Sequence, residues 1–288
     1  MGLQESLASG KFVLTSEIGP PKGIHIEEMM ADAELLRGRV DAINVTDLQS
    51  SVMRLGSLAV CHLLQEKGLE PIFQMTCRDR NRLGLQADLL SASVLGIKNV
   101  LALTGDYASL GDHPQAKPVF DLDSVNLIGV VKKLESGTDM VGNSLSGAPK
   151  FFVGAVVNPG ANPLEAQLIK MEKKIQAGAS FFQTQAVYDV QAFEQFMKRA
   201  SPFKVPILAG IILLKSAGMA RFMNKNVAGV FVPEPLVQRM AKAQDREKTS
   251  IEIAAELIRE LKGMCQGIHL MPIGWEKKIP AVLDLASV

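Results

Sequence analysis

Short apolar segments with the character of β-strands alternate with longer helical patterns along almost all of this 288-residue chain. Several of these segments are apolar on both faces, as expected for parallel strands covered by helices on each side. Eight strands alternating with helices favour an α/β fold of the (β/α)8 (TIM) barrel type. A doubly wound open sheet is the alternative, because periodicity alone does not show whether a sheet closes. The predicted strands cover residues 11–18, 41–47, 71–77, 99–105, 151–158, 181–187, 206–213 and 267–274.

The predicted helices carry apolar side chains at three-to-four spacing. In the last one, "TSIEIAAELIRELKGMCQG", we expect Thr249 and Glu252 to form a capping box and Gly267 to end the helix. No G-x-G-x-x-G follows the first strand and no G-x-x-x-x-G-K-[ST] occurs, which counts against a nucleotide-binding open sheet. The whole chain, 1–288, is therefore expected to form a single barrel domain. The other predicted helices cover residues 27–38, 50–67, 80–95, 121–135 and 163–177.

The overall composition excludes several classes of protein. Thirty-one basic against 30 acidic residues give a net charge of +1, so no basic field attracts nucleic acid or an anionic membrane. The sequence contains no apolar run long enough to span a bilayer and no signal-peptide pattern. Three scattered cysteines and four histidines without H-x-x-H or H-E-x-x-H spacing predict neither disulfides nor a metal site. We expect a cytoplasmic protein.

Polar side chains gather at the predicted C-terminal ends of the strands, where barrel enzymes carry their active sites. Carboxylates among neutral hydrogen-bonding groups suit acid–base chemistry with polar recognition of a ligand, and no nucleophile is evident. In chain order these residues are Glu17, Thr46, Asp47, Thr76, Cys77, Thr104, Gly105, Asp106, Asn158, Gln183, Thr184 and Gln185.

Several of these residues also have a purely structural interpretation. A carboxylate directly after a strand often caps the next helix, and this interpretation is favoured for Asp47 and Asp106 taken alone. Glu17 differs, because it lies in an apolar run before a Pro-Pro turn, where an unpaired buried carboxylate tends to take up a proton. Gln183 and Gln185 face the same side of one strand, either as ligand donors or as part of a polar layer inside the barrel.

Two longer polar segments, 106–120 and 136–150, are predicted to be ordered loops. Three arginines, Arg78, Arg80 and Arg82, follow the third predicted strand. We expect them to be solvated at the start of a helix rather than to contact a partner.

Six segments in order along the chain resemble the methylenetetrahydrofolate reductase family: "TSEIGPPKG", "NVTD", "FQMTCRDRN", "GIKNVLALTGD", "GAVVNP" and "AGASFFQTQAVYD". Each motif is short, but together they cover most of the chain. The segments "GDHPQAKPVFDLDS" and "GIHLMPIGWEKKIP" resemble the short bacterial branch, which includes enzymes of acetogenic bacteria. The resemblance implies a (β/α)8 barrel with a flavin at the strand ends, and reduction of 5,10-methylenetetrahydrofolate to 5-methyltetrahydrofolate. In that reaction protonation of N10 opens the imidazolidine ring, and a hydride passes from N5 of the reduced flavin to a 5-iminium cation.

The resemblance also implies roles for individual residues. Glu17 matches the general acid for ring opening, and Asp106 matches a carboxylate near both flavin and pterin that stabilises the cation. Gln185 matches a glutamine that hydrogen-bonds the pterin, so Glu17, Asp106 and Gln185 are the expected substrate-binding residues. The expected flavin contacts are Thr46, Gln74, Thr104, Gly105, Asp106 and Lys174, the last on the phosphate–ribityl side.

The chain also departs from the family pattern. Gln74–Cys77 stands where many relatives have "HLTC", and Thr104–Asp106 stands where they have "RGD". Val156 lies near the position of a family tyrosine, and Gln167 replaces a carboxylate. The resemblance favours FAD as the flavin, and these departures make FMN the alternative. Met219 falls where nicotinamide-stacking residues would be, which leaves direct oxidation of NAD(P)H open and motivates the hypothesis of a zinc- or iron–sulfur-containing electron-relay subunit.

Two other functions stay open from the sequence. One is a flavin-free, pterin-binding methyltransferase barrel, and the other is an inactive folate- or flavin-binding subunit that serves as a scaffold. The presence of both Glu17 and Asp106 argues against the scaffold. An oligomer is expected from the apolar barrel exterior.

Overall fold

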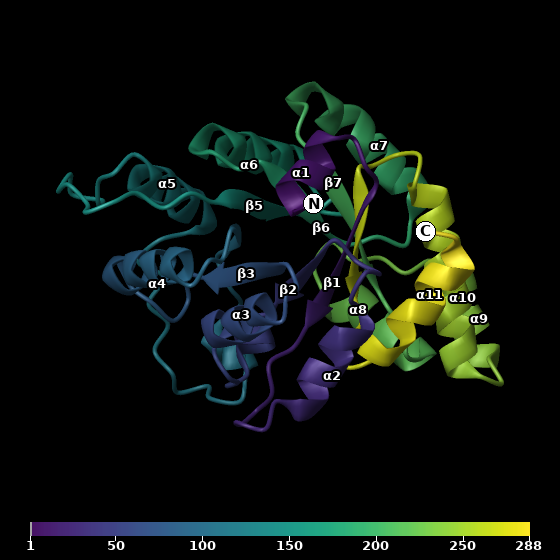
Figure 1. Cartoon of the computed structure of the whole chain (residues 1–288). Coiled ribbons are helices and arrows are strands. Elements are labelled where there is room, and N and C mark those ends of the chain that lie inside the picture. The colour runs from purple at the N-terminus through teal and green to yellow at the C-terminus, as the bar shows by residue number, and fades with distance from the viewer. Residues whose placement is uncertain (1) are drawn as a thin grey trace.

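The computed structural model describes residues 2–288, in which eight parallel strands close into a barrel in sequence order (Figure 1). Each strand pairs with the next, and pairing of the first strand with the last completes the ring. The predicted (β/α)8 barrel is thus confirmed, and the open-sheet alternative is excluded. The strands are β1 (Val13–Ile18), β2 (Ala42–Val45), β3 (Pro71–Thr76), β4 (Asn99–Leu103), β5 (Phe152–Val157), β6 (Phe181–Ala186), β7 (Ile207–Ile212) and β8 (Gly267–Met271).

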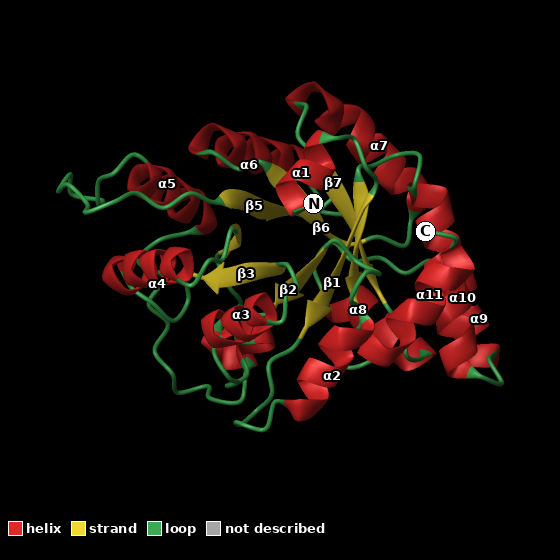
Figure 2. Ribbon diagram, viewed as in Figure 1, coloured by secondary structure: helices red, strands yellow, loops and turns green. Residues whose placement is uncertain are grey.

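Helices surround the barrel on its outside (Figure 2). Within residues 2–288, no helix has both the length and the apolar character needed to cross a membrane. The α-helices are α1 (Leu3–Ala8), α2 (Glu27–Leu35), α3 (Ser57–Glu66), α4 (Arg82–Val94), α5 (Ser124–Glu135), α6 (Leu164–Ala177), α7 (Val190–Ala200), α8 (Ala217–Asn226), α9 (Glu234–Lys242), α10 (Arg246–Leu261) and α11 (Ile279–Ala286). Short 3₁₀ turns are η1 (Gln49–Ser51), η2 (Ala108–Leu110), η3 (Ser201–Phe203) and η4 (Glu276–Lys278).

The predicted ends of α10 are wrong. Asp245 caps its N-terminus and accepts a hydrogen bond from the Lys248 backbone N–H at 3.0 Å. Thr249 therefore lies inside the first turn, where its hydroxyl donates to the Asp245 carbonyl at 2.8 Å. The helix ends at Leu261, and Gly267 begins β8 instead of ending the helix. Two cap-forming residues four positions apart compete here, and the upstream one starts the helix.

The helix predicted at 50–67 is shorter than expected, because the turn η1 and an irregular segment precede it and α3 begins only at Ser57.

The two predicted loops have internal structure. Segment 106–120 contains η2, and segment 136–150 is closed by an antiparallel bridge between Thr138 and Ser144.

Apolar side chains fill the N-terminal half of the barrel interior. The rings of Phe152 and Phe181 stack with centroids 4.9 Å apart. Gly154 makes room for them, because a Cβ there would lie 2.2 Å from the Phe181 ring. Leu3, on the short helix α1, is fully buried and packs into the same cluster. This end of the barrel is closed by hydrophobic packing.

A polar layer lies above this cluster, toward the C-terminal ends of the strands. Gln183 and Asn44 exchange two hydrogen bonds through their side-chain amides, at 2.8 and 3.0 Å. Gln183 also donates to the Thr15 hydroxyl at 3.3 Å. The interior therefore changes from apolar to polar along the barrel axis, and the polar end is the one that opens into a cavity.

Candidate active site

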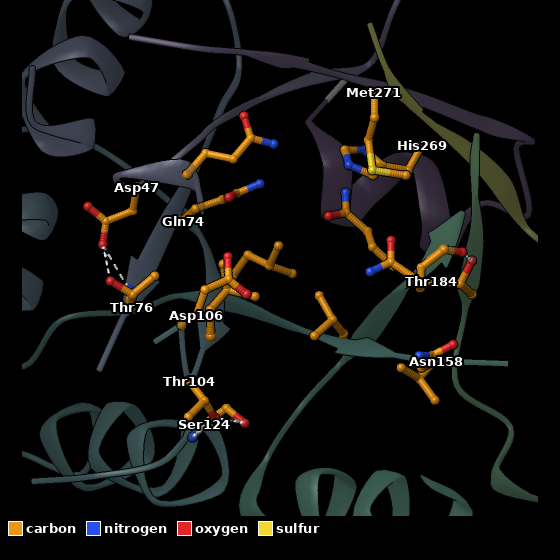
Figure 3. Close-up of a pocket in the computed structure, with 18 of the residues that line it drawn as sticks. Asp47, Gln74, Thr76, Thr104, Asp106, Ser124, Asn158, Thr184, His269 and Met271 are labelled. Carbon is orange, nitrogen blue, oxygen red and sulfur yellow. Dashed lines mark hydrogen bonds between the residues drawn. The ribbon is translucent and has the colours of Figure 1, made fainter. Parts of the chain in front are cut away.

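A cavity of about 380 Å³ opens at the C-terminal ends of the strands (Figure 3). This volume lies within the range usual for small-molecule sites. Most of the residues predicted for the site line it, namely Glu17, Gln74, Thr104, Gly105, Asp106, Lys174 and Gln185. Thr46 does not belong to the lining. It is buried, and its hydroxyl has no hydrogen-bond partner within residues 2–288.

Glu17 lies on the inner face of β1 and is 9% exposed. The Gln74 amide Nε2 donates to its Oε1 at 3.1 Å, and the His269 ring Nε2 lies 3.4 Å from the same oxygen. The other ring nitrogen of His269 is 2.9 Å from the Thr15 hydroxyl. Glu17 is therefore buried as predicted, but the expectation that it is unpaired is wrong. Both contacts use Oε1, which leaves Oε2 without a partner in the described part of the chain.

His269 is a site residue that the sequence analysis did not predict, because it belongs to no metal-type histidine spacing. One signal in the sequence does point to it. His269 lies two residues before Met271, the last residue of β8, so both side chains face the same side of the strand, and both line the cavity. Among residues 2–288, no group of three or more potential ligand side chains is arranged to hold a metal ion.

Asp106 lies at the mouth of the cavity, directly after Gly105, which has a φ of +97°. Its side chain is exposed and makes no hydrogen bond or ion pair with any described residue. The helix-cap interpretation of Asp106 is wrong, because Asp123 caps the next α-helix, α5, by accepting the Asn126 N–H at 2.8 Å. A carboxylate without a structural partner at a cavity mouth is available to a ligand.

Asp47 also does not cap a helix. Its carboxylate accepts the backbone N–H and the hydroxyl of Thr76 at 2.8 and 2.9 Å, and it pairs with Arg80 at 2.7 Å. Burial pushes the pKa of Asp47 upward, but the ion pair with Arg80 and the Thr76 hydrogen bonds outweigh burial and hold this pKa below its usual range.

The prediction that the three arginines after β3 are solvated is wrong for Arg80, which is mostly buried in its pair with Asp47. Arg82 lies at the surface, where it pairs with Asp121 at 2.8 Å.

The prediction of solvation is also wrong for Arg78, which is 2% exposed and lines the cavity. Its guanidinium pairs with Asp79 at 2.7 Å and donates to the Ser51 hydroxyl at 2.8 Å and to the Leu48 carbonyl at 3.2 Å. The sequence carries no signal for these contacts, because a run of charged residues after a strand is usually solvated.

One wall of the cavity is basic. Lys170 and Lys174 lie one turn apart on α6, and both line the cavity. The Lys174 ammonium donates to the Val156 carbonyl at 2.6 Å. Burial, reinforced by the charge of Lys170, lowers the pKa of Lys174 to about 8. An anion bound here would relieve the repulsion between the two lysines.

The two glutamines of β6 have different surroundings. Both line the cavity, but Gln183 is buried in the interior polar layer, whereas Gln185 is half-buried. The Gln185 side-chain oxygen accepts the Ala186 N–H at 3.0 Å. Its amide Nε2 has no partner among the described residues, so it can donate to a ligand.

The fold and the site together define a class of protein: a (β/α)8 barrel whose strand-end cavity combines carboxylates, amides and a basic wall. The sequence pattern of the methylenetetrahydrofolate reductase family matches residues 2–287, and the chain belongs to this family. The recognition made from short motifs is thereby confirmed.

Individual relatives agree with this assignment. Methylenetetrahydrofolate reductase 2 of Schizosaccharomyces pombe is 25% identical, and the match covers 98% of this chain and 46% of that protein. The 5,10-methylenetetrahydrofolate reductase of Pectobacterium carotovorum subsp. carotovorum is 28% identical, over 73% of this chain and 67% of that protein. This chain thus spans about half the length of the fission-yeast relative.

A solved structure shares the fold. An uncharacterized protein from Clostridium thermocellum, described as binding two copies of 5-methyl-5,6,7,8-tetrahydrofolic acid, has a TM-score of 0.66 and 18% sequence identity. The match covers 99% of this chain and 97% of that one.

Proposed function

We propose that this chain is a flavin-dependent reductase that converts 5,10-methylenetetrahydrofolate to 5-methyltetrahydrofolate. The observation that carries the proposal is one cavity holding a buried Glu17, an unpaired Asp106 and the basic pair of α6. Membership of the methylenetetrahydrofolate reductase family supports the reaction class.

The cavity residues fit a flavin. Leu101, Leu103 and Val156 give an apolar surface for a flat ring, and Gly105 places no side chain on the wall beside them. The α6 lysines suit the phosphate that FAD and FMN share, so both flavins are candidates, with FAD favoured by the family resemblance. When bound, the flavin supplies the hydride. The residues proposed to hold it are Gln74, Thr104, Gly105, Asp106 and Lys174, which all line the cavity, whereas Thr46 does not.

Glu17 is the proposed acid that opens the imidazolidine ring. Gln74 and His269 both contact Oε1, and this fixes the orientation of the carboxyl group. The proton then passes from Oε2, the oxygen without a protein partner, to N10 of the substrate. Burial excludes water from this transfer and strengthens the electrostatic interactions within the site.

Asp106 and Gln185 are proposed to act on the pterin and on the charge that develops there. Ring opening leaves a cation, and a carboxylate already in place at the cavity mouth stabilises that cation as it forms. The unpaired Nε2 of Gln185 donates to an acceptor on the pterin ring.

A partner subunit carrying zinc or an iron–sulfur cluster is the proposed source of electrons. The observation behind it is Met219, which lies near the start of α8 where the resemblance would place a nicotinamide-stacking residue. Full activity of the isolated chain with NADH would contradict this part of the proposal.

The visible spectrum of the purified chain, followed by release of the bound cofactor, tests the proposal. Absorbance at about 450 nm is expected of a bound flavin, and the released molecule identifies it as FAD or FMN. A colourless protein that neither flavin reconstitutes would favour the methyltransferase barrel or the scaffold.

A further inference from the structure

Arg78 has the largest fully buried side chain in the described part of the protein. Arginine is almost never fully buried unless it is paired, because desolvation of its charge is costly. Asp79 supplies the countercharge, since its carboxylate oxygens accept from Nε and one terminal nitrogen at 2.7 to 3.0 Å. The other contacts of the guanidinium, to Leu48 and Ser51, lie in the loop that follows β2.

The backbone of that loop is strained. Leu48, Ser50 and Ser51 have φ values of 47°, 55° and 59°, which residues other than glycine rarely adopt. Such strain persists only where surrounding contacts over-determine the conformation, and it is concentrated at functional sites. Leu48 and Ser50 line the cavity, so the strained segment is part of its wall.

Ser51 connects this loop to Asp106. Its hydroxyl accepts from Arg78 and donates to the Tyr107 carbonyl at 3.0 Å, with the Asp106 carbonyl at 3.3 Å. The two loops also touch through their backbones, because a Cβ on Gly111 would lie 1.8 Å from the Ser51 carbonyl oxygen. The guanidinium is thus one hydroxyl away from the backbone of the catalytic candidate.

Arg78 also holds the loop after β4 at two further points. A Cβ on Gly105 would lie 3.0 Å from the Arg78 Cβ, so the turn that presents Asp106 packs directly on this residue. The Arg78 carbonyl accepts the Val119 N–H at 2.7 Å, which holds the far end of the same loop.

We infer that Arg78 is a positioning residue: through Ser51 it fixes the loops after β2 and β4, and thereby places the Asp106 carboxylate over the cavity. The inference rests on the proposed function, because it assigns Asp106 its electrostatic role. Its guanidinium is engaged by Asp79, Ser51 and Leu48, so we assign Arg78 an effect that passes through Asp106.

Ser51→Ala tests this with little risk to folding, because it removes only the bridging hydroxyl from a half-buried position. The reduced flavoprotein is mixed with 5,10-methylenetetrahydrofolate and the rate of flavin reoxidation is followed by stopped flow. We expect a loss of roughly tenfold for Ser51→Ala and roughly 10²-fold for Arg78→Met, the scale of misplacing a catalytic group. Arg82→Met is the matched control, since Arg82 pairs with Asp121 at the surface and should keep the wild-type rate.

A double-mutant cycle with Asp106→Asn separates positioning from a general structural effect. If Arg78 and Ser51 act through the Asp106 carboxylate, Ser51→Ala should cost almost nothing further once that carboxylate is gone. The same tenfold loss in both backgrounds would overturn the inference.

Hydrogen exchange of the flavin-free protein gives a readout independent of activity. We expect amides of residues 48–53 and 104–112 to exchange faster in Ser51→Ala than in wild type, and to be unchanged in Arg82→Met. Wild-type exchange and wild-type rate in Ser51→Ala would overturn the inference. If the wild-type protein bound no flavin, the proposed function would fail, while exchange would still report whether Ser51 fixes the two loops.

Discussion

At the scale of single residues, the site separates two carboxylates by their surroundings. Glu17 is buried, with one oxygen held by Gln74 and His269, whereas Asp106 is exposed and unpaired at the mouth. Different environments allow two carboxyl groups in one site to do different work. Glu17 is suited to proton transfer and Asp106 to electrostatic stabilisation.

Glu17→Gln removes the proposed acid but preserves the shape and the hydrogen-bonding capacity of the side chain. We expect folate reduction to fall by about 10²- to 10⁴-fold, the scale of general acid catalysis. Reduction of the bound flavin by dithionite should be unchanged, because that step does not need the acid. Unchanged folate turnover would remove Glu17 from this role.

Asp106→Asn keeps the size of the side chain and removes its charge. The folate half-reaction should slow by roughly 10²-fold, as when one preorganised electrostatic group is lost. The measurement is single-turnover flavin reoxidation with saturating folate, so that weaker binding does not contribute. A wild-type rate would mean that the carboxylate has no part in the chemistry.

The sequence singled out Glu17 and Asp106 but not the residues that orient them. His269 lies 252 positions from Glu17 and reaches it only because β8 closes the barrel against β1. The sequence pattern predicts that Arg78 is solvated, and its burial follows from the fold of the loops after β2 and β4. Partners of this kind depend on tertiary structure, which local residue patterns do not encode.

At the scale of elements, α6 determines the charge of one cavity wall. Lys170 and Lys174 are one turn apart on the same face, an arrangement of like charges that destabilises an isolated helix. Burial and this repulsion together lower the pKa of Lys174 to about 8. Because a bound anion would offset the repulsion between the two lysines, this wall is suited to anion binding.

The flavin affinity should therefore depend on pH. Below about pH 8 Lys174 is protonated and attracts the flavin phosphate; above it the free protein loses this charge, so the dissociation constant should rise with pH. Fluorescence titration between about pH 7 and about pH 9.5 measures the dissociation constant. The phosphate charge is constant in this range, because the monoester of FMN has its second pKa at about 6 and the diphosphate of FAD does not titrate there. Lys174→Met should abolish the dependence.

Lys170→Met is a control for which the direction of the shift in the pH profile can be predicted. The charge of Lys170 lowers the pKa of Lys174, so its removal should move the loss of affinity to higher pH. An equal pH profile in wild type and Lys174→Met would show that Lys174 does not bind the phosphate.

Elements were predicted well where periodicity is strong and poorly where caps compete. All eight strands occur within their predicted ranges, since period and length both favour them. The start of α10 was misplaced because Asp245 and Thr249 both qualify as caps. The start of α3 was misplaced because tertiary contacts bind the segment before it. Ser51 accepts from Arg78, and the backbone N–H groups of Met53 and Leu55 donate to Asp112 and to the Pro21 carbonyl.

At the scale of the whole molecule, the barrel has one end for stability and one for chemistry. Leu3 and the stacked Phe152 and Phe181 close the N-terminal end, while the cavity lies at the C-terminal ends of the strands. Barrel enzymes generally divide the two roles in this way. Closure itself could not be read from periodicity, which an open sheet would share.

Leu3→Ala tests this division. Truncation of a fully buried leucine should lower the free energy of unfolding by about 2–5 kcal/mol, measured by urea denaturation. The rate of the folate half-reaction at 25 °C should not change, because the mutation lies at the opposite end of the barrel. Leu7→Ala, at a partly buried position beside the same cluster, should cost less stability. A slowed half-reaction in folded Leu3→Ala protein would contradict the division.

The proposed reaction in this cavity is transfer of a hydride from flavin to 5,10-methylenetetrahydrofolate. The most direct measurement is an anaerobic single turnover, in which the flavoprotein is reduced with dithionite and mixed with that folate. We expect absorbance at about 450 nm to return while one equivalent of 5-methyltetrahydrofolate forms per flavin. A flavin that stays reduced in the presence of bound folate would contradict it.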